Sequence, residues 1–62
     1  MKIEFDGKVM EYDRPIVVYK LLEKLSLNRE TYLVMVNDSL VTEDHRLSPE
    51  DRVKLIRIIS GG

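Results

Sequence analysis

Residues 1–5 alternate between apolar and charged side chains. This period of two is typical of a strand that buries one face. Asp6-Gly7 follows at once and favours a tight turn, because glycine accepts positive φ without steric cost. Residues 8–12 are predicted to form the returning strand. The chain is therefore expected to begin with an antiparallel β-hairpin.

Helical spacing replaces this alternation after Asp13-Arg14-Pro15, which interrupts the strand pattern. The apolar positions at helical spacing are Val18, Leu21, Leu22 and Leu25. No Ser, Thr, Asp or Asn directly precedes this segment, so the start of the helix is poorly marked. A helix of about two to three turns is unstable alone. We therefore expect its leucine stripe to lie across a sheet.

The second half of the chain is predicted to be mainly β. We expect a strand over 32–36, a turn over 37–39 and a short edge strand over 40–41. A polar loop over 42–51 should follow, anchored by Leu47 and closed by a turn at 48–51. The final strand is expected over 52–59. No repeat or linker interrupts this order. We predict one α+β domain over 1–59, followed by a flexible tail over 60–62.

Length and charge exclude several classes of function. A chain of 62 residues spends most of its apolar residues on folding, so a deep enzyme pocket is not expected. Its 10 basic and 11 acidic residues are spread evenly and leave no footprint for nucleic acid. No membrane-spanning or leader segment is recognised, and cysteine is absent. These features predict a cytoplasmic binding or carrier module.

An exposed apolar surface is expected beside the tail. The last strand would place Val53 and Leu55 on one face and Lys54, Ile56 and Ile58 on the other. The helix covers only one face of the sheet, and the strand at 32–36 is apolar on both, so either Leu33 and Met35 or Val34 and Val36 must face outward. We predict partner docking through Lys54, Ile56, Arg57 and Ile58. The alternatives are that the loop over 42–51 or a dimer contact covers this surface.

His45 is the one histidine of the chain. It stands beside Glu43 and Asp44 in the polar loop, and no second ligand lies at a convincing spacing. We therefore expect a solvated side chain and no metal site.

The element order, together with the ending over 53–62, resembles the ThiS/MoaD family of ubiquitin-like β-grasp sulfur carriers. The matching segments are Leu21-Leu22-Glu23-Lys24-Leu25, Val36-Asn37, Leu47 and Ser60-Gly61-Gly62. The resemblance implies a mixed sheet of four to five strands packed on one helix, with the first and last strands parallel in the middle. The chain departs from the family at turn and cap positions: it has Pro49-Glu50-Asp51 for Asp-Gly-Asp, Ser26 for a glycine that ends the helix, and no Ser or Thr cap near Val17.

The resemblance also implies the chemistry. The carboxylate of Gly62 would be adenylated with ATP by a separate adenylyltransferase, and a persulfide donor would convert it to a thiocarboxylate. A synthase of thiamine thiazole or molybdopterin biosynthesis would accept the sulfur. Gly61 and Ser60 would form a slender tail, and the chain itself would be neither an enzyme nor a cofactor binder. Its three glycines, at 7, 61 and 62, form no phosphate loop, which agrees with activation by a partner.

Two other functions remain open at this stage. A ubiquitin-like modifier would pass through the same adenylate and end in an isopeptide bond from Gly62 to lysines of other proteins. A noncovalent interaction module would have an inert, frayed Gly-Gly end. The sequence alone hardly separates the carrier from the modifier.

Overall fold

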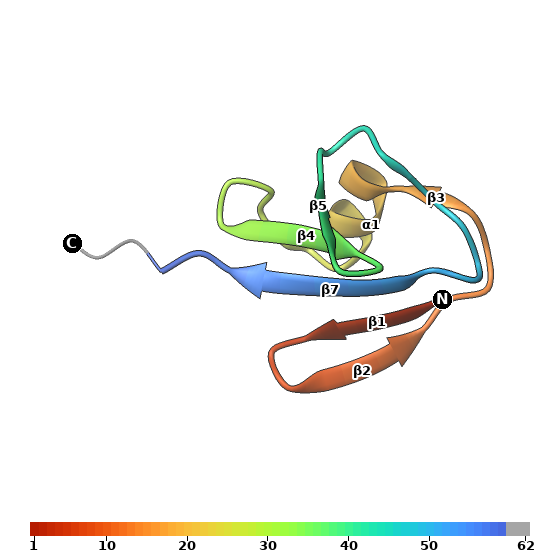
Figure 1. Ribbon diagram of the computed structural model, residues 1–62. Coiled ribbons are helices and arrows are strands. Elements are labelled where there is room, and N and C mark those ends of the chain that lie inside the picture. Colours follow the sequence, from red (N-terminus) through yellow and green to blue (C-terminus); the bar gives the residue numbers. More distant parts are fainter. Residues whose placement is uncertain (60–62) are drawn as a thin grey trace.

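A computed structural model describes residues 1–59. Its elements are β1 (Lys2–Phe5), β2 (Lys8–Glu11), β3 (Ile16–Val17), α1 (Val18–Lys24), β4 (Tyr32–Val36), β5 (Ser39–Val41), β6 (Arg46–Leu47) and β7 (Arg52–Arg57). Five strands form one sheet in the order β2-β1-β7-β4-β5, and β3 pairs with β6 in a small second sheet. Helix α1 lies over one face of the large sheet (Figure 1). The predicted α+β, β-grasp architecture is confirmed.

The centre of the sheet is formed by strands from opposite ends of the chain. Strand β7 pairs with β1 in parallel, with Ile3 opposite Val53. On its other edge β7 pairs with β4 antiparallel, with Val34 opposite Leu55. The expected parallel first and last strands are therefore present, and β7 is hydrogen-bonded along both edges.

The two hairpins of the large sheet turn through residues with positive φ. Asp6 and Gly7 have φ of 49° and 75°, as predicted for the first turn. Asn37 and Asp38 have φ of 50° and 70° and form the second. Ser39 was predicted to be part of this turn and instead begins β5. The reason is that two left-handed residues suffice to reverse the chain in register.

Helix α1 is capped by backbone rather than by a side chain. The amides of Val18 and Tyr19 donate to the carbonyls of His45 and Glu43, each at 2.9 Å. These bonds satisfy two of the donors that a helix start leaves free, which explains why no Ser or Thr cap is needed. At the other end Ser26 has φ of 57°, its amide bonds the Glu23 carbonyl, and the Leu27 amide bonds that of Leu22.

Two further predicted boundaries are wrong. The loop over 42–51 contains β6, whose Leu47 pairs with Ile16 of β3, because two-residue strands are too short to show a period. The last strand ends at Arg57 and not at Ile59. β-branched composition suggested the longer strand, but the last residue of β4 to pair with it is Tyr32, opposite Arg57.

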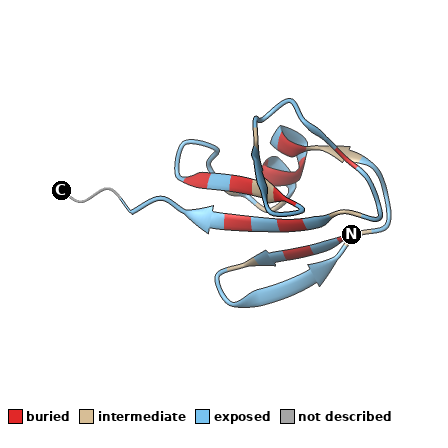
Figure 2. Ribbon diagram, in the orientation of Figure 1, coloured by how far each residue is buried: buried red, intermediate tan, exposed pale blue. Residues whose placement is uncertain are grey.

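The core lies between α1 and the sheet. Buried positions alternate along β1, β4 and β7 (Figure 2). The fully buried side chains of largest volume are Ile3, Leu21, Leu47 and Val18. Leu47, predicted to anchor the loop, has 0% exposure, which confirms that prediction.

Candidate functional site

Ser60, Gly61 and Gly62, the predicted tail and carrier site, lie outside the described residues. The structure does describe the residues directly before them, Ile58 and Ile59. Beyond β7, the Ile58 amide donates to the Thr31 carbonyl at 2.7 Å. The side chain of Ile58 is 42% exposed and that of Ile59 86%. Apolar residues thus lie in solvent at the point where the described chain ends.

Strand β7 divides its side chains between the two faces of the sheet. Val53 and Leu55 are buried against the helix side. Lys54 and Ile56 therefore lie on the opposite face, which we call the open face. Strand β4 resolves the alternative left by its sequence, since Val34 and Val36 are buried and Leu33 is 43% exposed.

The open face carries an apolar patch near the end of β7. Its members are Leu33, Met35, Leu40 and Ile56, joined by the register pairs Leu33 with Ile56 and Met35 with Leu40. Leu40 is 64% exposed and Ile56 36%. Within the described chain α1 lies on the other face (Figure 1), and neither β6 nor the rest of the 42–51 segment belongs to the five-stranded sheet.

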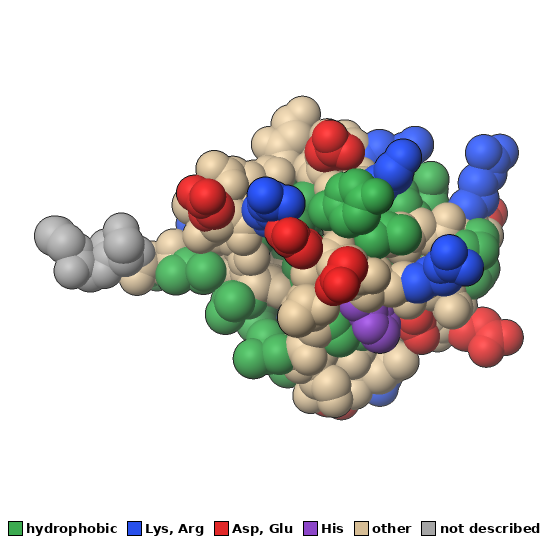
Figure 3. Space-filling model, turned by 90° about the horizontal axis from the view of Figure 1, so that it is seen from above, with side chains coloured by type: hydrophobic (Ala, Val, Ile, Leu, Met, Phe, Trp, Pro, Cys, Tyr) green, Lys and Arg blue, Asp and Glu red, His purple; other side chains and the backbone are tan. Residues whose placement is uncertain are grey.

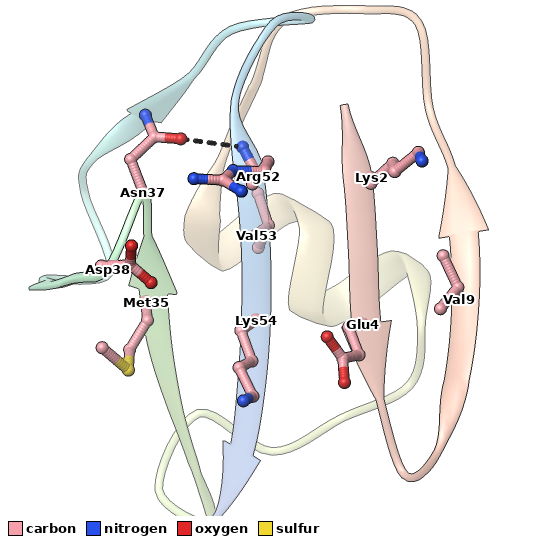
Figure 4. A pocket seen from close by; sticks show the side chains of 9 residues that line it. All are labelled: Lys2, Glu4, Val9, Met35, Asn37, Asp38, Arg52, Val53 and Lys54. Carbon is pink, nitrogen blue, oxygen red and sulfur yellow. Dashed lines mark hydrogen bonds between the residues drawn. The ribbon is translucent and has the colours of Figure 1, made fainter.

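Charged residues lie on the open face next to the apolar patch, on the side nearer the start of β7. Lys54 lies opposite Met35 on one side and Glu4 on the other. Figure 4 shows the shallow hollow of about 340 Å³ that they border, lined by Lys2, Glu4, Val9, Met35, Asn37, Asp38, Arg52, Val53 and Lys54. At its edge the Arg52 amide donates to the Asn37 side-chain oxygen at 3.1 Å. The open face is therefore apolar beside the end of β7 and charged beside its start.

Arg57 is not on the open face with Lys54 and Ile56. It lies opposite Tyr32, and its Nη2 and Nε donate to the Tyr32 hydroxyl at 3.0 and 3.3 Å. The hydroxyl donates to Asp6 Oδ2 at 3.1 Å. The hydrogen bond to Tyr32 chiefly raises the pKa of Arg57 above its ordinary value, and electrostatic interactions with Tyr32 and then Asp6 add to this effect. We call Asp6, Tyr32 and Arg57 the strand-end cluster.

The roles of Asp6 and Tyr32 in this cluster were not predicted from the sequence. The two residues are 26 positions apart, and only the register of three strands brings them to Arg57. No local motif signals such a contact, although the predicted order of the strands, with alternation, would have placed Tyr32 and Arg57 on one face.

His45 has an exposed side chain, and its backbone carbonyl accepts the helix amide of Val18. Residues 1–59 contain no group of three His, Cys, Asp or Glu side chains able to hold a metal ion. Seen from above relative to Figure 1, acidic and basic side chains are interspersed (Figure 3), so the side of the molecule in that view presents no field of one sign. None of the helices in the described part of the chain is long and apolar enough to span a membrane.

Comparison with known proteins gives a consistent result. The model of the ThiS family matches residues 3–62. A search of curated proteins finds no significant match. The crystal structure of the thiamine biosynthesis protein ThiS from Geobacter metallireducens superposes with a TM-score of 0.70, covering 100% of both chains at 22% identity. At that identity the superposition shows a shared fold.

Proposed function

The chain belongs to the ThiS family, and we propose that it is a sulfur carrier of thiamine biosynthesis that works through the carboxylate of Gly62. The observation that carries the proposal is the extent of the family match, which runs from Ile3 through the terminal Gly61-Gly62. The fold shared with a thiamine biosynthesis protein supports the same pathway. The molybdopterin branch, predicted alongside it, has no comparable support here.

Glycine at the last positions suits the chemistry. A carboxylate is a poor electrophile, so its oxygen first attacks the α-phosphorus of ATP on a partner adenylyltransferase, and pyrophosphate leaves. The outer sulfur of a partner persulfide then attacks the acyl carbon, and AMP leaves. A thiol cleaves the resulting S–S bond, is itself oxidised to a disulfide, and leaves a thiocarboxylate on Gly62. Without a Cβ, Gly61 and Gly62 pass a narrow channel and leave the carbonyl open to attack.

We propose that the apolar patch docks the adenylyltransferase and, in turn, the thiazole-forming acceptor. An apolar surface of Leu33, Met35, Leu40 and Ile56 next to the end of β7 positions a partner over the place where the tail begins. Lys54 lies beside the patch and contributes charge at its rim. Ile58 and Ile59, both exposed, extend the apolar surface toward the tail.

Intact mass spectrometry of protein recovered from its native host under non-oxidising conditions tests the carrier function. The expected result is a species heavier by the exchange of one oxygen for sulfur, absent when Gly62 is deleted. Heavier adducts linked to lysines of other proteins would instead establish the modifier. If neither species is found and thiamine synthesis is unaffected by the deletion, the result would support the noncovalent interaction module.

Ile56→Glu tests the docking face. A charge placed in the patch is expected to raise the KM of the adenylyltransferase for the carrier by about tenfold or more, because a buried unpaired charge opposes the contact. The control is Tyr19→Glu, which introduces the same charge at a residue of α1 with similar exposure, 40%. Equal kinetics for the two variants would rule out docking through the open face.

A further inference from the structure

We propose that the strand-end cluster positions the tail: Asp6, Tyr32 and Arg57 fix the point at which the chain leaves the sheet, and Tyr32 and Arg57 are positioning residues for the reaction at Gly62. The role of the cluster in fixing the end of β7 follows from contacts among the described residues alone. Its catalytic consequence rests on the proposed function. Arg57, predicted to dock a partner, would act instead within the carrier.

The cluster spans three neighbouring strands at one end of the sheet. Arg57 is the last residue of β7, Tyr32 the first of β4, and Asp6 directly follows β1. Because β7 lies between β1 and β4, hydrogen bonds from Arg57 through Tyr32 to Asp6 tie the end of β7 to both neighbours. Figure 1 shows all three strand ends on the side from which the chain leaves the sheet.

The hydrogen-bond geometry at Tyr32 indicates that the end of β7 is held in one position, and not only by the Arg57–Asp6 ion pair. Two nitrogens of the Arg57 guanidinium converge on one hydroxyl oxygen, which orients the planar group. Tyr32 is only 6% exposed, so its ring cannot turn away. The direct approach of Arg57 to Asp6 is longer, at 3.8 Å, between side chains that are 63% and 41% exposed. The Tyr32 hydroxyl is therefore the centre of the cluster, and the Arg57–Asp6 ion pair is secondary.

Fixing this point shortens the segment that a partner has to order. Gly62 follows Arg57 by 62 − 57 = 5 residues, a reach of about 17 Å when extended. If Arg57 and Ile58 fray, those residues too must be ordered before the carboxylate meets ATP. Ordering one more residue reduces the productive population by about five- to thirtyfold. The four residues of the apolar patch, Leu33, Met35, Leu40 and Ile56, lie before the frayed segment, so docking through them should persist.

Tyr32→Phe removes the central hydroxyl and keeps the buried ring. With the purified adenylyltransferase we expect kcat for adenylation to fall by about fivefold or more, while KM changes less than twofold. Arg57→Lys, which keeps the charge but not the two converging donors, is expected to lose nearly as much as Arg57→Ala. Heteronuclear ¹⁵N NOE values of Ile58 and Ile59 should fall in all three variants.

The matched control is Asn37→Gly. It deletes side-chain hydrogen bonds at the start of β7 and tolerates the positive φ of that turn. An unchanged kcat in folded Tyr32→Phe, an equal loss in Asn37→Gly, or NOE values like those of the wild type would overturn the positioning role. A wild-type carrier that is not adenylated at all would overturn the proposed function, and the NOE comparison would still decide whether the cluster holds the strand end.

Discussion

Ser26 lies two residues beyond the last residue of helix α1, Lys24, and has φ of 57°, a left-handed conformation that glycine adopts without cost. Its amide and that of Leu27 close the helix onto the carbonyls of Glu23 and Leu22, so the conformation is enforced by the capping bonds. The resemblance to the family implied a glycine at this position. The structure supplies the physical reason.

Ser26→Gly is expected to raise the free energy of unfolding by about 1 kcal/mol, because it relieves the left-handed strain at the helix end. Ser26→Ala keeps a Cβ and should give no such gain. Urea unfolding followed by circular dichroism measures both. Equal stability of the glycine and alanine variants would mean that this end of the helix is not strained.

Asp51 is expected to make the folding stability decrease at acidic pH. Its carboxylate accepts the Ser48 amide at 2.8 Å and the Asn37 side-chain amide at 3.1 Å, and chiefly the Ser48 bond lowers its pKa below the ordinary value. A lowered folded pKa contributes stability that is present above the unfolded pKa and is lost as the pH falls through the folded one.

Tm measured from pH 7 to pH 2 should therefore fall less steeply below about pH 4 in Asp51→Asn than in the wild type. Asp44 has a pKa lowered mainly by its Thr42 hydrogen bond and stays in place, so some acid sensitivity should remain. Asp13→Asn, a change at an exposed carboxyl, serves as control. Parallel curves for all three proteins would contradict the assignment.

At the scale of elements, the 42–51 segment is tied down far more than its polar composition suggests. Leu47 is fully buried, β6 pairs with β3, and the carbonyls of Glu43 and His45 receive the first amides of α1. Loop, second sheet and helix start are therefore expected to unfold together as one cooperative unit.

Leu47→Ala should lower the free energy of unfolding by about 2–5 kcal/mol, through lost burial and the cavity left behind. Hydrogen exchange of the Val18 and Tyr19 amides should quicken with it, because their acceptors lie in the same segment. Leu40→Ala, at a residue that is 64% exposed, is the matched control and should change stability by about 0.5 kcal/mol at most. Unchanged exchange at the helix start would contradict the coupling.

Elements with a clear period were predictable from the sequence. The first hairpin, the leucine stripe of α1 and the inward alternation of Val53 and Leu55 all follow from spacing. The pairing of β3 with β6 was not, because two residues show no period. Nor was the end of β7 at Arg57, since Ile58 and Ile59 favour strand by composition while no further partner residue of β4 continues the pairing.

The candidate site was likewise predictable only where its residues follow a period along one strand. The position of Lys54 and Ile56 on the face away from the helix follows from alternation, whereas the choice between the two faces of β4 required the burial of Val34 and Val36. Asp6, Tyr32 and Arg57 meet only through tertiary register, which local sequence does not encode. The carrier function itself came from a resemblance and not from any geometry.

At the scale of the whole molecule, folding and the proposed chemistry use separate parts of the chain. The buried core of the described residues lies between Met1 and Leu55. Deleting residues 60–62 is therefore expected to leave the free energy of unfolding within about 0.5 kcal/mol of the wild type while abolishing thiocarboxylate formation. Thermal unfolding and mass spectrometry of the same preparation test both halves. A large loss of stability would show that the tail belongs to the fold.

The parallel pairing of β1 and β7 also determines how the molecule bears a mechanical load. A force that draws the chain out along β7 acts across the hydrogen bonds on both of its edges, which are perpendicular to the strand in the antiparallel ladder with β4 and slanted in the parallel ladder with β1. Such a load shears both ladders together, whereas a force across the β1–β2 hairpin opens its bonds one after another. A partner that drew on the end of β7 would therefore load both ladders at once, and the sheet is expected to resist unfolding in that direction.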